Sequence, residues 1–171
     1  MRETREDFER LQSLLDESYA RAGEHLRSIF RPELRFSAED LAAFFVGRRQ
    51  VAVATVSEHG DPRVAPVDAL LLEGAFHFGT HVSAARVRHL RANPAVSLTY
   101  YERDELAVVV HGTAELMEFR NAPFEEVDEA FVHVYGGTLS TAEEASVYVR
   151  VEPTAMFTYA RDPSLLRHAD A

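Results

Sequence analysis

Between Val51 and Glu115 the sequence restricts the possible folds more than anywhere else in the chain. Short runs of β-branched and other apolar residues alternate there with tight-turn sequences such as Ser57–Pro62 and Glu73-Gly74. One short helix interrupts the series; it is predicted from Ser83 to Ala92 and ends at Asn93-Pro94. Strands joined mostly by tight turns favour a closed or nearly closed antiparallel barrel over a βαβ sheet.

Six strands are predicted in all. The last contains Pro153, which predicts a bulge or a sheet edge at that position. A second inserted helix is predicted from Ala122 to Tyr135, because Pro123 suits a first turn and Gly136-Gly137 break the pattern. The predicted strands are 51–56, 63–72, 75–79, 96–101, 106–117 and a final strand that starts at Val147.

The first part of the chain has the pattern of a helical arm. Apolar residues recur at spacings of three and four from Phe8 to Ile29, which predicts one amphipathic helix that packs on the core or on a partner subunit. Thr4 and Asp7 have the spacing of a capping pair, and Ser37 begins a shorter second helix in the same way. We therefore expect a mainly β (α+β) chain with a helical arm over residues 1–46, a barrel domain over 47–160 and a tail over 161–171.

Composition excludes several classes of function. The 171 residues carry 28 acidic and 18 basic side chains, a net charge of −10, which disfavours binding to nucleic acid. Every basic residue other than histidine is arginine, so lysine Schiff-base chemistry and a Walker-type phosphate loop are excluded. Cysteine is absent as well, which removes disulfides, thiolate metal sites and cysteine nucleophiles.

The N-terminal residues are charged where a secretory signal would be apolar. No apolar run approaches the length that crosses a membrane. We therefore expect no membrane partner and a cytoplasmic location.

Basic residues crowd the short helix predicted after Ser83, in spite of the acidic balance of the chain. Hydroxyl groups, backbone N–H groups and a guanidinium at a helix start suit a phosphate dianion. The opposing interpretation is a solvated basic helix face with Ser83 as a plain N-cap. The candidate anion ligands are Thr80, His81, Ser83 and Arg86, with Arg88, His89 and Arg91 further along the helix.

Several segments, in this order, resemble the pyridoxamine 5′-phosphate oxidase-like family. The resemblance implies an FMN-binding, six-stranded antiparallel split β-barrel that usually forms a homodimer, with a flavin or deazaflavin at each subunit interface. Some members of the family handle haem. The segments are Ala54–Val67, Phe76–Thr80, Ser83–Arg86, His89–Ser97 and Val110–Ala114.

Carried over to this chain, the resemblance places the isoalloxazine ring along Val64, Ala65, Pro66 and Val67, and the phosphate at Thr80, His81, Ser83 and Arg86. Many relatives have lysine where this chain has Arg86, which keeps the charge and changes its reach. The arginine and lysine pair that true pyridoxine phosphate oxidases carry on the second strand is missing, so that substrate is not expected.

The resemblance implies a flavin-type oxidoreductase that transfers hydride to or from a small organic substrate. FMN is preferred over a deazaflavin because deazaflavin relatives commonly use a lysine-rich groove. Haem is a further alternative cofactor, and a non-catalytic flavin or haem carrier is the alternative function. The sequence has no obvious catalytic acid, base or nucleophile, which fits both the oxidoreductase and the carrier because hydride transfer does not require one.

Other residues give weaker hypotheses. Tyr100, Tyr101 and His111 are candidates for a substrate pocket, although a hydrogen-bonded histidine on the barrel is an equally good interpretation of His111. His77 and His81 with Asp68 do not have the spacing of a metal site, so no metal is expected. A Gly-x-Ser-x-Gly elbow is also absent, which leaves a serine hydrolase unsupported.

Overall fold

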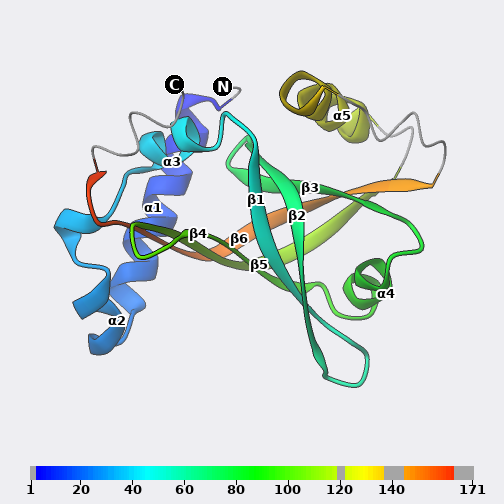
Figure 1. Cartoon of the computed structure of the whole chain (residues 1–171). Coiled ribbons are helices and arrows are strands. Elements are labelled where there is room, and N and C mark those ends of the chain that lie inside the picture. Colours follow the sequence, from blue (N-terminus) through cyan, green and yellow to red (C-terminus); the bar gives the residue numbers. More distant parts are fainter. Residues whose placement is uncertain (1–2, 119–121, 137–144, 164–171) are drawn as a thin grey trace.

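The computed structural model describes residues 3–118, 122–136 and 145–163, and it contains the expected six-stranded barrel (Figure 1). The strands close in the order β1-β2-β3-β6-β5-β4, and every pair is antiparallel. The strands are β1 (Arg49–Val56), β2 (Pro62–Leu72), β3 (Ala75–His81), β4 (Ala95–Glu102), β5 (Leu106–Glu118) and β6 (Ser146–Ala160).

The predicted turns and the predicted bulge are confirmed. Glu73 and Gly74 both have positive φ, 51° and 73°, which is the geometry of the two-residue turn that best fits the twist of a hairpin. On β6, Pro153 lies opposite Gly112 whereas Ala155 lies opposite His111, so Thr154 is the extra residue of a bulge. A Cβ atom at Gly112 would collide with the carbonyl oxygen of Glu152, which explains glycine at that place.

The helices are α1 (Arg5–Arg21), α2 (Glu24–Ile29), α3 (Ala38–Phe44), α4 (Ala85–Ala92) and α5 (Ala122–Tyr135), with a short 3₁₀ turn at Pro32–Leu34. The single helix predicted from Phe8 to Ile29 is wrong, because Ala22 and Gly23 are extended and separate α1 from α2. Glycine lowers helix stability by about 1 kcal/mol, and the break lets the buried ring of Phe30 pack against Phe157.

Two helices begin with the side-chain caps that the sequence predicts. Thr4 and Asp7 form a complete capping box at the start of α1, and Ser37 and Asp40 form another at α3. Each box satisfies backbone N–H groups that have no partner inside the helix.

One apolar core fills the barrel and extends onto α1 and α3. Leu11 and Leu15 of α1 and Leu41 of α3 are buried with Phe76 and Phe78 of β3. Polar atoms fix the position of α1 as well: the hydroxyl of Tyr19 accepts a hydrogen bond of 2.7 Å from the backbone N–H of Thr158 on β6. The amphipathic stripe therefore packs on the core of its own chain.

Helix α5 packs against the outside of the barrel and forms a second apolar cluster there with β2, β5 and β6. Its last turn is hydrogen-bonded to Arg48, just before β1, and to Arg49, the first residue of β1. Arg48 donates to the carbonyl oxygens of Val134 and Tyr135 at 3.1 and 3.2 Å, and the backbone N–H of Arg49 donates to the Tyr135 hydroxyl at 3.0 Å. Within the described ranges, no helix is both long and apolar enough to cross a membrane.

Candidate functional site

A groove of about 380 Å³ lies between α4 and the β1–β2 hairpin. The far end of this hairpin extends beyond the other strands of the barrel (Figure 1). Thr55 pairs with Arg63 and Val53 with Ala65, so these four residues share the face of the hairpin that lines the groove. The remaining lining residues are Val64 of β2 and Ala84, Ala85, Arg86, Arg88 and His89 around and on α4.

The start of α4 differs from the starts of α1 and α3. Its N-cap is Ala84, which makes no side-chain cap. Ser83 is not the cap, so this part of the opposing interpretation is wrong; its backbone N–H donates to His81 Nδ1 at 3.2 Å, and its hydroxyl lies 2.7 Å from the same nitrogen. The first-turn N–H groups of α4 therefore have no side-chain acceptor, and a helix start of this kind favours a bound anion.

Arg86 provides the charge at this helix start. Its side chain is half-buried on the groove wall, and burial lowers the pKa of its guanidinium from the usual value. It has no ion pair or hydrogen bond with any other residue that the structure describes, and no carboxylate lines the groove. A half-buried cation without a counter-charge is unfavourable, and a bound anion would remove that cost.

The other basic residues of the groove are already engaged. Arg88 contacts the carbonyl oxygen of Ser83 at 3.5 Å, and Arg63 pairs with Asp61 at 3.3 Å. His89 Nδ1 lies 3.0 Å from Thr55 Oγ1, a bond that joins α4 to β1 at the floor of the groove. Arg86 is thus the lining arginine that is half-buried and has neither a hydrogen-bond nor an ion-pair partner among the described residues.

The structure brings some of the predicted cofactor ligands together and not others. Val64, Ala65 and Arg86 line the groove, whereas the side chain of Val67 is buried in the barrel core. Thr80, His81 and Ser83 lie at the end of β3 and in the loop before α4, outside the lining. Pro66 is exposed on β2 beside Ala65.

Thr55 was not predicted as a site residue, and His89 was named only as part of the basic cluster on the helix, although each had a signal. Thr55 continues the alternation of Val51 and Val53 along β1, which places all three side chains on one face. His89 follows Arg86 at a spacing of three, which places both on one side of a helix.

The predicted substrate-pocket residues do not line this groove in the same chain. Tyr100 packs its ring against Phe44 and Phe45, with centroids 5.1 and 6.1 Å away. Tyr101 and His111 are exposed on β4 and β5, where His111 Nδ1 lies 2.8 Å from Ser97 Oγ. His111 therefore has the hydrogen bond expected of a barrel histidine, and Tyr100 is separated from Tyr101 by the alternation of the strand.

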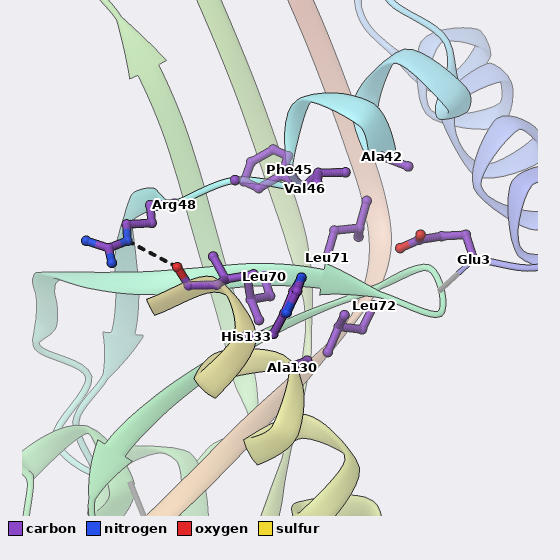
Figure 2. A pocket seen from close by; sticks show the side chains of 12 residues that line it. Glu3, Ala42, Phe45, Val46, Arg48, Leu70, Leu71, Leu72, Ala130 and His133 are labelled. Atoms are coloured by element: carbon purple, nitrogen blue, oxygen red, sulfur yellow. Dashed lines mark hydrogen bonds between the residues drawn. The ribbon is translucent and has the colours of Figure 1, made fainter. Parts of the chain in front are cut away.

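A second cavity, of about 460 Å³, lies between α5, the connection from α3 to β1 and the end of β2 (Figure 2). Leu70 and Leu72 point to one side of β2 and Leu71 to the other, and His133 of α5 also lines the cavity. The guanidinium of Arg48 is committed to the carbonyl oxygens at the end of α5. This cavity consequently lacks the unpaired cation that distinguishes the groove beside α4.

Comparison of the sequence with known families finds a match that spans the barrel. The model of the pyridoxamine 5′-phosphate oxidase family matches residues 37–160, which include the whole barrel. The chain belongs to this family. A comparison with curated protein sequences finds no significant match to this chain.

Solved structures share the fold of this pyridoxamine 5′-phosphate oxidase family member at low sequence identity. A conserved hypothetical protein from Mycobacterium tuberculosis has a TM-score of 0.68 and 19% identity, over 78% of this chain and 91% of that one. An F420 reductase has a TM-score of 0.55 and 22% identity, over 67% and 93%. The haem storage protein HutZ from Vibrio cholerae has a TM-score of 0.58 and 19% identity, over 71% and 93%.

The histidines considered for a metal site are separated in this family member. His77 is buried on β3, with 2% of its surface exposed and Nδ1 3.2 Å from the carbonyl oxygen of Ala75, whereas His81 is exposed at the end of the strand. Among the described residues, no three histidine, cysteine, aspartate or glutamate side chains lie close enough to hold a metal ion.

Burial of His77 should make the stability of the protein sensitive to acid. Burial, assisted by the nearby charge of Arg150, lowers the pKa of His77 from 6.5 to about 4. As the pH falls through this range the unfolded chain binds a proton that the folded chain does not, so the free energy of unfolding should drop by up to about 3 kcal/mol. Urea unfolding between pH 7 and 4 measures this loss.

His77→Gln should remove that part of the pH dependence, whereas His59→Gln in the exposed turn should keep it. Parallel curves for wild type and His77→Gln would contradict the assignment.

Proposed function

We propose that this protein binds FMN in the groove between α4 and the β1–β2 hairpin and acts as an oxidoreductase on a small organic substrate. The observation that carries the proposal is Arg86, a half-buried cation without a counter-charge at a helix start without a side-chain cap. Membership of the pyridoxamine 5′-phosphate oxidase family supports flavin chemistry in general.

The residues present fit the two ends of FMN. A phosphate dianion beside Arg86 would accept charge-assisted hydrogen bonds from the guanidinium and from first-turn N–H groups. On β2 the half-buried side chain of Ala65 lies on the groove face opposite Val53 of β1, and Val64 also lines the groove. A flat aromatic ring laid along this apolar stretch would have a second point of attachment.

A bound flavin supplies the hydride chemistry, and the protein supplies position and charge. In this arrangement Arg86 and the start of α4 hold the phosphate, while Val64 and Ala65 support the ring. None of these residues needs to exchange a proton with the substrate, and no carboxylate lines the groove.

The arrangement also bears on the competing cofactors. An F420 reductase and a haem storage protein have the same fold at 22% and 19% identity, so the fold alone does not select the cofactor. The phosphate-binding features beside Arg86 favour a phosphorylated cofactor over haem. The absorption spectrum of the purified protein tests this directly, because flavin, deazaflavin and haem have different bands.

We also propose that the protein is a homodimer and that the second copy completes the site. The groove is open on one side, and exposed residues on β4 and β5, including Tyr101 at 68% and His111, form a separate surface. A second copy that covers the ring would supply the substrate pocket that one chain leaves incomplete.

Sedimentation at micromolar concentration should give about twice the 19.2 kDa of one chain. The reason is that a cofactor site built from two subunits needs an interface large enough to persist at this dilution. A strict monomer under these conditions, with FMN bound at full occupancy, would contradict the proposed interface site.

Replacing Arg86 should weaken FMN binding while the fold stays intact. Loss of a charge-assisted hydrogen bond in Arg86→Ala should cost about 1.5–3 kcal/mol, or roughly ten- to a hundredfold in Kd. Flavin fluorescence titration measures the change, and a thermal melt checks the fold. Arg103→Ala, in the exposed turn between β4 and β5, is the matched control and should bind FMN like wild type. Equal affinities for wild type and Arg86→Ala would place the phosphate elsewhere.

Turnover distinguishes an enzyme from a carrier. FMN-loaded protein that has been reduced should be reoxidised by a quinone or an enone faster than by oxygen, and faster than free FMN is. His111→Ala should slow this step and leave FMN affinity nearly unchanged, because His111 lies outside the groove. Tight binding without acceleration by any acceptor in a broad panel would identify a carrier instead.

A further inference from the structure

His89 lies beside Arg86 on the wall of the same groove. The two residues are three positions apart on α4, so their side chains occupy neighbouring places on one helix face, and both are half-buried. Sites about one turn apart on a helix are separated by roughly 5 Å along its axis. A ligand group that reaches Arg86 is therefore also within the range of the His89 imidazole.

The hydrogen bond to Thr55 holds the imidazole in place without fixing its protonation state. Thr55 is 3% exposed, and its hydroxyl lies 3.0 Å from His89 Nδ1. A hydroxyl group can donate to a neutral ring nitrogen or accept from a protonated one. The bond survives in both states, and Nε2 has no partner among the residues that the structure describes.

The charges around His89 are almost all positive before a ligand binds. None of the lining residues is acidic, and Asp61, in the turn before β2, pairs with Arg63. A phosphate dianion in the half-enclosed groove would bring a negative charge next to the imidazole, and such a charge attracts a proton to a neighbouring basic nitrogen. The charged or titratable groups on the elements packed against His89 are Arg86, Arg88 and Arg91 of α4, Arg49 of β1, Arg63 and Asp68 of β2, and His111, Glu115 and Glu118 of β5. Of these, the ones that line the groove are Arg63, Arg86 and Arg88.

We propose that His89 is a second phosphate-binding residue and that it takes up one proton when the phosphate-bearing ligand binds. The proton comes from solvent and is held on the imidazole, where Nδ1–H donates to Thr55 and Nε2–H donates to a phosphate oxygen. The inference rests on the proposed function, since it takes the phosphate of FMN as the ligand group. It adds that affinity for the ligand depends on pH through a residue of the protein.

Calorimetric titration of the protein with FMN at pH 7.5 tests the proposal, in two buffers that differ in ionisation enthalpy. At this pH the phosphate is mostly a dianion, since its second pKa is about 6. The difference in heat between the buffers gives the number of protons taken up. Wild type should take up a fraction of a proton, up to one, per FMN bound, and riboflavin, which lacks the phosphate, should give none.

His89→Asn is the decisive variant, because asparagine can keep a hydrogen bond to Thr55 but cannot accept a proton. We expect it to bind FMN without proton uptake and roughly tenfold more weakly, with riboflavin affinity unchanged. A merely structural role for His89 would instead weaken the binding of FMN and of riboflavin equally.

FMN binding without proton uptake by wild type, or with equal uptake by His89→Asn, overturns the inference and leaves the proposed function standing. Failure of wild type to bind FMN overturns both. Should His89→Asn not fold, the comparison of FMN with riboflavin on wild type still decides the question of proton uptake.

Discussion

The alternation of side chains along β1 is the constraint on which the candidate site depends. Val51 and Val53 point into the barrel core, and Thr55 continues the same face after the hairpin has left the barrel. One face of one strand thus serves as core at one end and as the floor of the groove at the other. Since the register with β2 is continuous, Arg63 and Ala65 are carried onto the same wall.

Helix α4 completes the groove because its two faces have different environments. Val87 and Leu90 are buried and anchor the helix to the barrel, and this orientation turns Arg86 and His89 toward the hairpin. The result is a local concentration of positive charge on a chain with a net charge of −10. Long-range attraction of an anion by the whole protein is therefore weak, and recognition depends on contacts made within the groove.

The parts of the structure that the sequence could predict are those governed by local rules. Turn residues, capping pairs and strand alternation located the six strands, the boxes at Thr4 and Ser37 and the bulge at Pro153. The break at Gly23 depends on where Phe30 is buried, which is a tertiary effect that a helical period does not contain. The same holds for the site: Arg86 was recognisable, but the bond between Thr55 and His89 joins residues 34 apart. Likewise, the pairing of Ser83 with His81 replaces a cap that the sequence pattern alone suggested.

Closure of the barrel has a consequence for association. Each of the six strands has two hydrogen-bonded neighbours, so the paired stretches of the sheet present no free edge to which another strand could add. Backbone pairing is the least selective way for two chains to join, since any extended segment can take part. Along these paired stretches, recognition between copies would be made by side chains on the outer faces, where shape and chemistry discriminate between one surface and another.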